Sequence, residues 1–112
     1  MTFSYAPKRG DIVWLDFFPQ SGREQSGRRP AICISPLEYN KKVGLGIFCP
    51  ITSIKKGYPF EVLLPEELPI AGVILADQIR NLDWQSRQAD YLCSLPEEEL
   101  VEVLNKIRAL IT

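Results

Sequence analysis

The sequence predicts a mainly β fold with helices, in which a small barrel-like sheet precedes a C-terminal amphipathic helix. Short apolar segments rich in branched and aromatic residues recur between turns, as the strands of a small sheet do. In the first of these, residues 12–18, the even-numbered and the odd-numbered positions are both largely apolar, so both faces of the strand are apolar. A strand of this kind suits a barrel-like sheet with one face inside and the other covered by a helix or a partner chain.

Five strands are expected along the chain. They span residues 12–18, 31–35, 45–51, 60–64 and 72–77. Residues 36–40 are long enough for one helical turn, and residues 78–84 either prolong the fifth strand or bend around the rim of the barrel. No repeat or domain boundary interrupts the series, so we expect residues 1–112 to form a single domain.

The end of the chain carries the signals of a helix. Ser94 and Glu97 have the spacing of a capping box. The apolar residues beyond them repeat at helical intervals; they are Leu100, Val103, Leu104, Ile107 and Ile111. Acidic residues lie in the first turn and basic residues near the end, as the helix dipole favours.

Hydropathy and cysteine usage limit the class of protein. No stretch of eighteen apolar residues occurs and the N-terminal segment lacks the apolar core of a signal peptide, so we expect a cytosolic protein with no membrane span. Cys33, Cys49 and Cys93 are far apart in a chain without histidine, so they form no zinc motif. We interpret all three as core or half-buried residues.

Charge is distributed unevenly along the chain. Nine of the 13 basic residues but only four of the 14 acidic ones precede Glu61. The first half therefore has the charge to meet a polyanion, which favours a localised nucleic-acid face, although a solvated surface would give the same counts.

The polar segment between the first two strands points to one kind of chemistry. This segment, the flap, is QSGREQSGRR at residues 20–29; we expect a long mobile loop that ends in Arg28 and Arg29 at the mouth of a strand. Histidine is absent and the carboxylates are scattered, which disfavours most hydrolytic and metal-dependent mechanisms. RNA carries its own nucleophile, the 2′-hydroxyl, and an arginine suits the charge of the phosphorane that forms.

Several motifs in order resemble the MazF/PemK family of toxin endoribonucleases. They are GDIVWLDF, GREQSGRRPAICISP, PITS, KGYPFEV, GVILADQI and the terminal PEEEL helix. The resemblance implies an SH3-like antiparallel β-barrel, a homodimer and metal-independent cleavage of single-stranded RNA without a cofactor, leaving 2′,3′-cyclic phosphate and 5′-hydroxyl ends. It also implies an antitoxin whose acidic tail lies in the basic groove.

The resemblance assigns three catalytic residues. Arg29 would stabilise the phosphorane, and Thr52 would hold the phosphate or the 2′-hydroxyl. Glu24 would have a polarising or positioning role. The alternatives are a salt bridge for Arg29, a strand-end turn for Thr52 and a solvated loop charge for Glu24.

The expected RNA contacts are bases stacked on aromatic rings and phosphates held by cations. The candidates are Arg28, Gln25, Lys55, Lys56, Tyr58 and Phe17. Two other functions remain open at this point. A gyrase poison of the same fold is one, although such relatives end differently from ALIT, and a non-enzymatic SH3-like binding module is the other.

Overall fold

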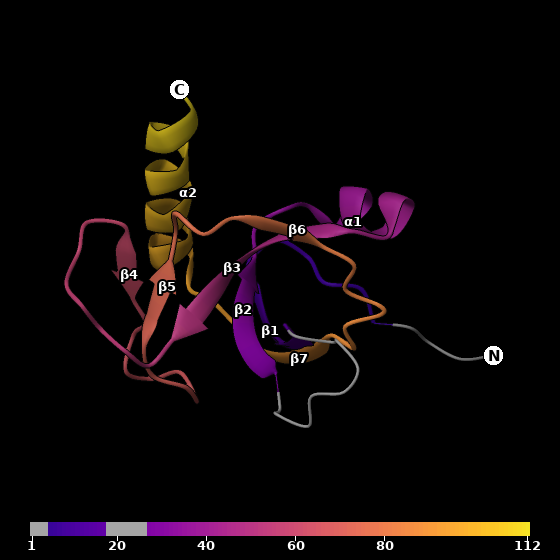
Figure 1. Ribbon diagram of the computed structural model, residues 1–112, viewed down its shortest axis with the longest axis horizontal. Coiled ribbons are helices and arrows are strands. Elements are labelled where there is room, and N and C mark those ends of the chain that lie inside the picture. The colour runs from indigo at the N-terminus through magenta and orange to yellow at the C-terminus, as the bar shows by residue number, and fades with distance from the viewer. Residues whose placement is uncertain (1–4, 18–26) are drawn as a thin grey trace.

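The computed structural model describes residues 5–17 and 27–112, and within these it has seven strands and two helices (Figure 1). The strands are β1 (Asp11–Asp16), β2 (Arg28–Cys33), β3 (Gly46–Thr52), β4 (Glu61–Leu63), β5 (Val73–Leu75), β6 (Arg80–Leu82) and β7 (Asp90–Ser94). The helices are α1 (Leu37–Val43) and α2 (Glu97–Ile111). The predicted class, mainly β with a short helix and a C-terminal helix, is confirmed.

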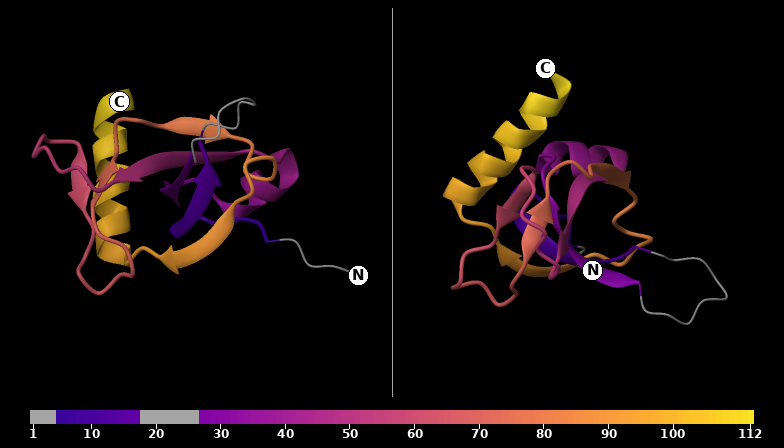
Figure 2. Two further views of the ribbon diagram at one scale, coloured as in Figure 1. Left: turned by 60° about the horizontal axis from the view of Figure 1, so that its bottom comes forward. Right: turned by 60° about the vertical axis from the view of Figure 1, so that its left-hand side comes forward.

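Strand β3 is the centre of an antiparallel sheet. The strand order is β4-β5-β3-β2-β1-β7, and β6 adds to β3 outside this path. Strand β2 pairs with one edge of β3, whereas β6 pairs with the first half of the other edge and β5 with its second half. The left view in Figure 2 shows β3 (magenta) running below β6 (orange) toward the end of the molecule where β4 and β5 lie.

The predicted sheet is a barrel only in a loose sense, because it is not closed. Among the described residues the end strands β4 and β7 do not pair with each other. Strand β4 has only three residues, and α2 contacts it. A helix therefore covers the apolar surface that strand closure would otherwise cover.

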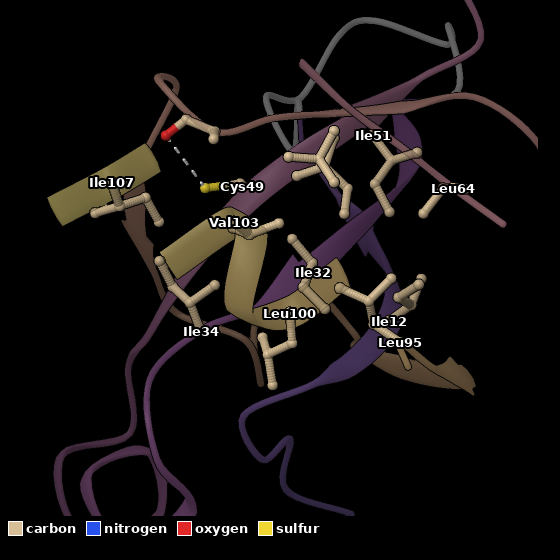
Figure 3. Packing of buried hydrophobic residues seen from close by; sticks show 13 residues of the cluster. Ile12, Ile32, Ile34, Cys49, Ile51, Leu64, Leu95, Leu100, Val103 and Ile107 are labelled. Carbon is tan, nitrogen blue, oxygen red and sulfur yellow. Dashed lines mark hydrogen bonds between the residues drawn. The ribbon is translucent and has the colours of Figure 1, made fainter. Parts of the chain in front are cut away.

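The sheet buries apolar side chains on both faces, as the two apolar faces of the first strand predicted. Cluster 1 lies between the sheet and α2 and includes Ile12, Ile32 and Cys49 together with Leu100, Val103 and Ile107 of the helix (Figure 3). Cluster 2 lies on the other face; its buried members are Val13, Leu15, Phe17, Ala31, Cys33, Phe48, Leu82 and Trp84. Neither helix is long and apolar enough to cross a membrane, as judged on residues 5–17 and 27–112.

Two further sequence expectations need correction at the C-terminal end. Strand β7 was not predicted, and Ser94 is its last residue. Ser94 therefore caps no helix: its Oγ lies 2.8 Å from the Tyr91 hydroxyl, and α2 begins after Pro96 without a side-chain cap. The apolar period of the helix is confirmed, although Ile111 is 72% exposed at its end.

Candidate active site at the open end of cluster 2

Arg29 and Thr52 come together across neighbouring strands. The β2–β3 register pairs Ala31 with Pro50, and the same register continued by two residues brings Arg29 opposite Thr52. Side chains alternate along a strand, so Arg29 lies on the face of Ala31 and Cys33, and Thr52 on the face of Phe48. The two predicted residues therefore meet at the open end of cluster 2.

A hollow of about 230 Å³ lies at this place. We call it the central hollow; it is lined by Phe17, Arg29, Pro50, Ile51, Thr52, Leu75, Gln78 and Arg80. Of these lining residues two are cationic and none is acidic. The hollow therefore has the charge and the polar groups to accept an anion.

The hydroxyl of Thr52 is oriented by the backbone that follows it. Its Oγ1 accepts a hydrogen bond of 3.1 Å from the N–H of Ile54. This is the turn contact that sequence reasoning weighed as an alternative to catalysis. The hydroxyl hydrogen remains without an acceptor among the described residues, so turn formation leaves Thr52 a donor to offer a ligand.

Gly72, the residue before β5, packs closely against the backbone of Thr52. Its φ is +140°, and a Cβ at this position would lie 2.3 Å from the carbonyl oxygen of Thr52. Only glycine permits this approach. The glycine of the GVILADQI segment thus positions the threonine of the PITS segment.

A second hollow continues from Thr52 toward the β3–β4 loop. This Tyr58 hollow, of about 190 Å³, is lined by Thr52, Ile54, Lys56, Tyr58, Glu61, Leu75 and Gln78. Tyr58 donates a hydrogen bond of 2.8 Å to Asp77, which raises the pKa of its hydroxyl. The carboxylate of Glu61 accepts the backbone N–H groups of Lys56 and Gly57, so the loop that carries Tyr58 is anchored.

Arg28, the neighbour of Arg29, is occupied by contacts within the protein. Its guanidinium donates to Asp16 at 2.8 Å, to Asp90 at 2.7 Å and to the carbonyl oxygen of Gln88 at 2.7 Å. These contacts join the start of β2 to β1 and β7. We call this group the Arg28 clamp.

Phe17 is more buried than an RNA-stacking platform would be. It is 7% exposed and packs in cluster 2. The guanidinium carbon of Arg80 lies 5.7 Å from the centre of its ring. Arg80 was not singled out from the sequence, because it lies in the acidic half of the chain and outside any basic cluster.

The remaining predicted residues fall in two groups. Lys55 is exposed next to Lys56 and lines neither hollow. Glu24 and Gln25 lie outside the described residues, as does most of the flap.

The cysteines have the buried environments that the sequence predicted. Cys33 and Cys49 are fully buried and Cys93 is half-buried, and all three are unpaired. Burial raises the pKa of each thiol, to about 12 for Cys49. No group of three or more cysteine or acidic side chains within residues 5–17 and 27–112 is arranged to hold a metal ion.

The fold and the site together define a small antiparallel β protein with a cationic, anion-accepting hollow at the end of its core. Residues 8–111 match the family of PemK-like, MazF-like toxins of type II toxin–antitoxin systems. The chain therefore belongs to this toxin family, and the resemblance predicted from its motifs is confirmed.

Named relatives agree with this membership. The chain is 43% identical over 111 residues to the endoribonuclease toxin MazF of Escherichia coli (strain K12), covering 99% of each chain. The crystal structure of MazF from Deinococcus radiodurans matches with a TM-score of 0.88 and 52% identity, covering 96% of this chain and 98% of that one. A MazE–MazF structure from the same organism matches with a TM-score of 0.87, 47% identity and coverage of 96% and 97%.

Proposed function

We propose that this chain is an endoribonuclease toxin that cleaves single-stranded RNA without a metal ion. The observation that carries the proposal is that Arg29 and Thr52 line one cationic hollow on an exposed rim. Relatives over nearly the full chain are named endoribonucleases, which supports the class of reaction. The other two candidate functions have no comparable support from the site.

In the proposed reaction the RNA supplies the nucleophile. The 2′-hydroxyl loses its proton as its oxygen forms a bond to the adjacent phosphorus. The bond from phosphorus to the 5′-oxygen breaks, and the leaving 5′-oxygen takes up a proton, so that no net proton is gained or lost. The products are a 2′,3′-cyclic phosphate and a 5′-hydroxyl. No water is consumed in this step.

The site residues provide charge and position for this step. Arg29 presents two donors to the phosphoryl oxygens and so stabilises the negative charge that grows in the phosphorane. The hydroxyl of Thr52 donates to the phosphate and aligns it with the 2′-oxygen. Glu24 remains our candidate for polarising the attacking hydroxyl.

RNA on either side of the cut would follow the hollows and the basic loop. Tyr58 and Lys56 line the hollow next to the central one, which supports a base stacked on the ring and a phosphate beside the lysine. Lys55 extends the same loop. Arg28 and Gln25 remain candidates for RNA contacts, whereas Phe17 lines the central hollow but is only 7% exposed.

The partners in this proposal are a second copy of the chain and an antitoxin. A relative has been solved with MazE, which supports a cognate antitoxin for this chain. An acidic, disordered tail would occupy the cationic surface and exclude RNA. When no antitoxin is bound, the toxicity of the chain would come from mRNA cleavage and arrested translation.

Cleavage of a long RNA of varied sequence in the presence of EDTA tests the proposal. We expect the wild type to produce discrete fragments with 5′-hydroxyl ends, and Arg29→Ala to be slower by about 100-fold or more, because it removes the charge that stabilises the phosphorane. Lys42→Ala serves as the matched control, since Lys42 is an exposed cation on α1 that lines none of these hollows. This control should cleave like the wild type.

Two results would contradict the proposal. A folded wild type that leaves RNA intact in EDTA excludes the metal-independent nuclease. An Arg29→Ala variant that cleaves at the wild-type rate removes Arg29 from the mechanism. Inhibition of gyrase without RNA cleavage would favour the alternative toxin function.

A further inference from the structure

Arg80 reaches the central hollow from the side of β3 opposite Arg29. Strand β2, which carries Arg29, and strand β6, which carries Arg80, pair with opposite edges of β3. Arg80 alternates with Leu82 of cluster 2, so its side chain is on the same face of the sheet as Arg29. The hollow therefore has an arginine on each side and the β3 residues Pro50, Ile51 and Thr52 between them.

Arg80 is held in place by an aromatic ring. Its guanidinium carbon is 5.7 Å from the centroid of Phe17, a contact in the range of cation–π interactions. Phe17 is itself held in cluster 2 with only 7% exposure. A guanidinium held by a ring keeps N–H groups available for in-plane hydrogen bonds to a phosphate.

The two arginines of the hollow have no carboxylate partner in the part of the chain that the structure describes. Arg28, one residue from Arg29, differs because Asp16 and Asp90 neutralise it. Two cations that line one hollow of about 230 Å³ repel each other, and an anion bound between them relieves this repulsion. This arrangement favours a phosphodiester as the ligand.

We propose that Arg80 is a second phosphate-binding residue, which contacts the RNA backbone in the central hollow beside Arg29 and is positioned there by Phe17. The inference rests on the proposed ribonuclease function and deepens it. It also gives Phe17 a role different from the base stacking that the sequence suggested, since the ring supports a cation rather than a nucleobase.

Arg80 and Arg29 differ in the step that they affect. Arg29 acts on charge that develops during the reaction, so its loss lowers kcat. Arg80 binds backbone charge that is present in both the ground state and the transition state, so its loss raises KM and changes kcat little. The two contributions can therefore be separated by kinetics.

The test uses the full-length protein and an RNA oligonucleotide that spans a cut site mapped on a longer RNA. For Arg80→Ala we expect KM to rise about 10-fold and kcat to stay within about 3-fold of the wild type. The slope of log affinity against log salt should fall by about 0.7, the value for one phosphate contact on a single strand. Arg108→Ala, an exposed arginine on α2, is the control and should behave like the wild type.

A double-mutant cycle tests the part assigned to Phe17. Phe17→Leu keeps an apolar side chain in cluster 2 but removes the ring, so it should raise KM in the wild type and have no further effect on Arg80→Ala. If Phe17 instead stacks on a base, its effect on KM will be the same in both backgrounds, and the positioning role is wrong.

The outcomes separate this inference from the function on which it rests. If the wild type does not cleave RNA, the proposed function fails first. If the wild type cleaves RNA but Arg80→Ala keeps the wild-type KM and salt slope, or loses activity through kcat alone, Arg80 is not a phosphate-binding residue while the ribonuclease function stands. Arg80→Gln provides the same comparison should the alanine variant show a disturbed circular dichroism spectrum.

Discussion

Replacing Arg28 with alanine should destabilise the fold, whereas the same change at Arg29 should barely affect stability and should abolish most cleavage. The two residues are adjacent and chemically identical. They differ because Arg28 forms the Arg28 clamp, while Arg29 lines the central hollow and has no ion pair with the described residues.

The size of the effect follows from the contacts of the clamp. The bonds to Asp16 and to the Gln88 carbonyl involve an arginine side chain that is 31% exposed, so solvent screens them and each is worth about 1 kcal/mol, less than a fully buried charged hydrogen bond. Asp90 is 76% exposed, and its ion pair adds roughly 0–1 kcal/mol. Arg28→Ala should therefore cost about 2–3 kcal/mol, which lowers Tm by roughly 10 °C in a domain of this size.

Urea unfolding followed by fluorescence of the buried Trp84 measures this cost, with Arg29→Ala as the matched variant. We expect a loss of at most about 0.5 kcal/mol for Arg29→Ala, as for surface substitutions that break no network. A cycle with Asp16→Asn should give a coupling of about 1 kcal/mol to Arg28. Unfolding of the two arginine variants at the same urea concentration would show that the Arg28 clamp does not stabilise the fold.

Two further predictions concern Gly72 and Cys49. Gly72→Ala should displace Thr52 and slow cleavage about 10-fold or more, measured by single-turnover kinetics. Gly44 also has a positive φ, of +81°, but no neighbour within 4 Å, so Gly44→Ala should lose stability without that loss of rate. Burial, with a smaller effect of Asp77, raises the pKa of Cys49 from 9.0 to about 12, so its thiol stays protonated in the folded chain while it ionises in the unfolded one. The free energy of unfolding should therefore fall with pH between about 9 and 12, and Cys49→Ala should make that decline shallower by about 1.4 kcal/mol per pH unit; parallel curves would contradict the assignment.

The hydrophobic patterns of the sequence predicted the elements that such patterns determine by themselves. The strands with strong apolar character and the C-terminal helix were found, since hydrophobic period alone specifies them. Strand β7 was missed because Asp90–Ser94 has a polar residue at each end and is mostly exposed or half-buried. The open edge of the sheet also has no local signal, since it depends on α2 packing against β4.

The candidate site divides in the same way. Motifs identified Arg29 and Thr52, and the register of β2 and β3 then brought them together. Arg80 could not be found from the sequence, because it lies more than 60 residues along the chain from Phe17 and their contact depends on the pairing of β6 with β3. Alternation along β2 places Arg28 and Arg29 on opposite faces, but only the positions of Asp16 and Asp90 show which of them is neutralised.

The uneven charge of the sequence corresponds to a division between the two faces of the sheet. The acidic first turn of α2 belongs to a helix that packs on cluster 1, whereas Arg29 and Arg80 lie at the end of cluster 2 on the other face. The acidic residues of that turn are thereby kept on the opposite side of the sheet from the hollow, even though Arg80 comes from the acidic half of the chain. A chain with a net charge of −1 can in this way present a local positive potential to a polyanion, because the sheet keeps these positive and negative side chains on different faces.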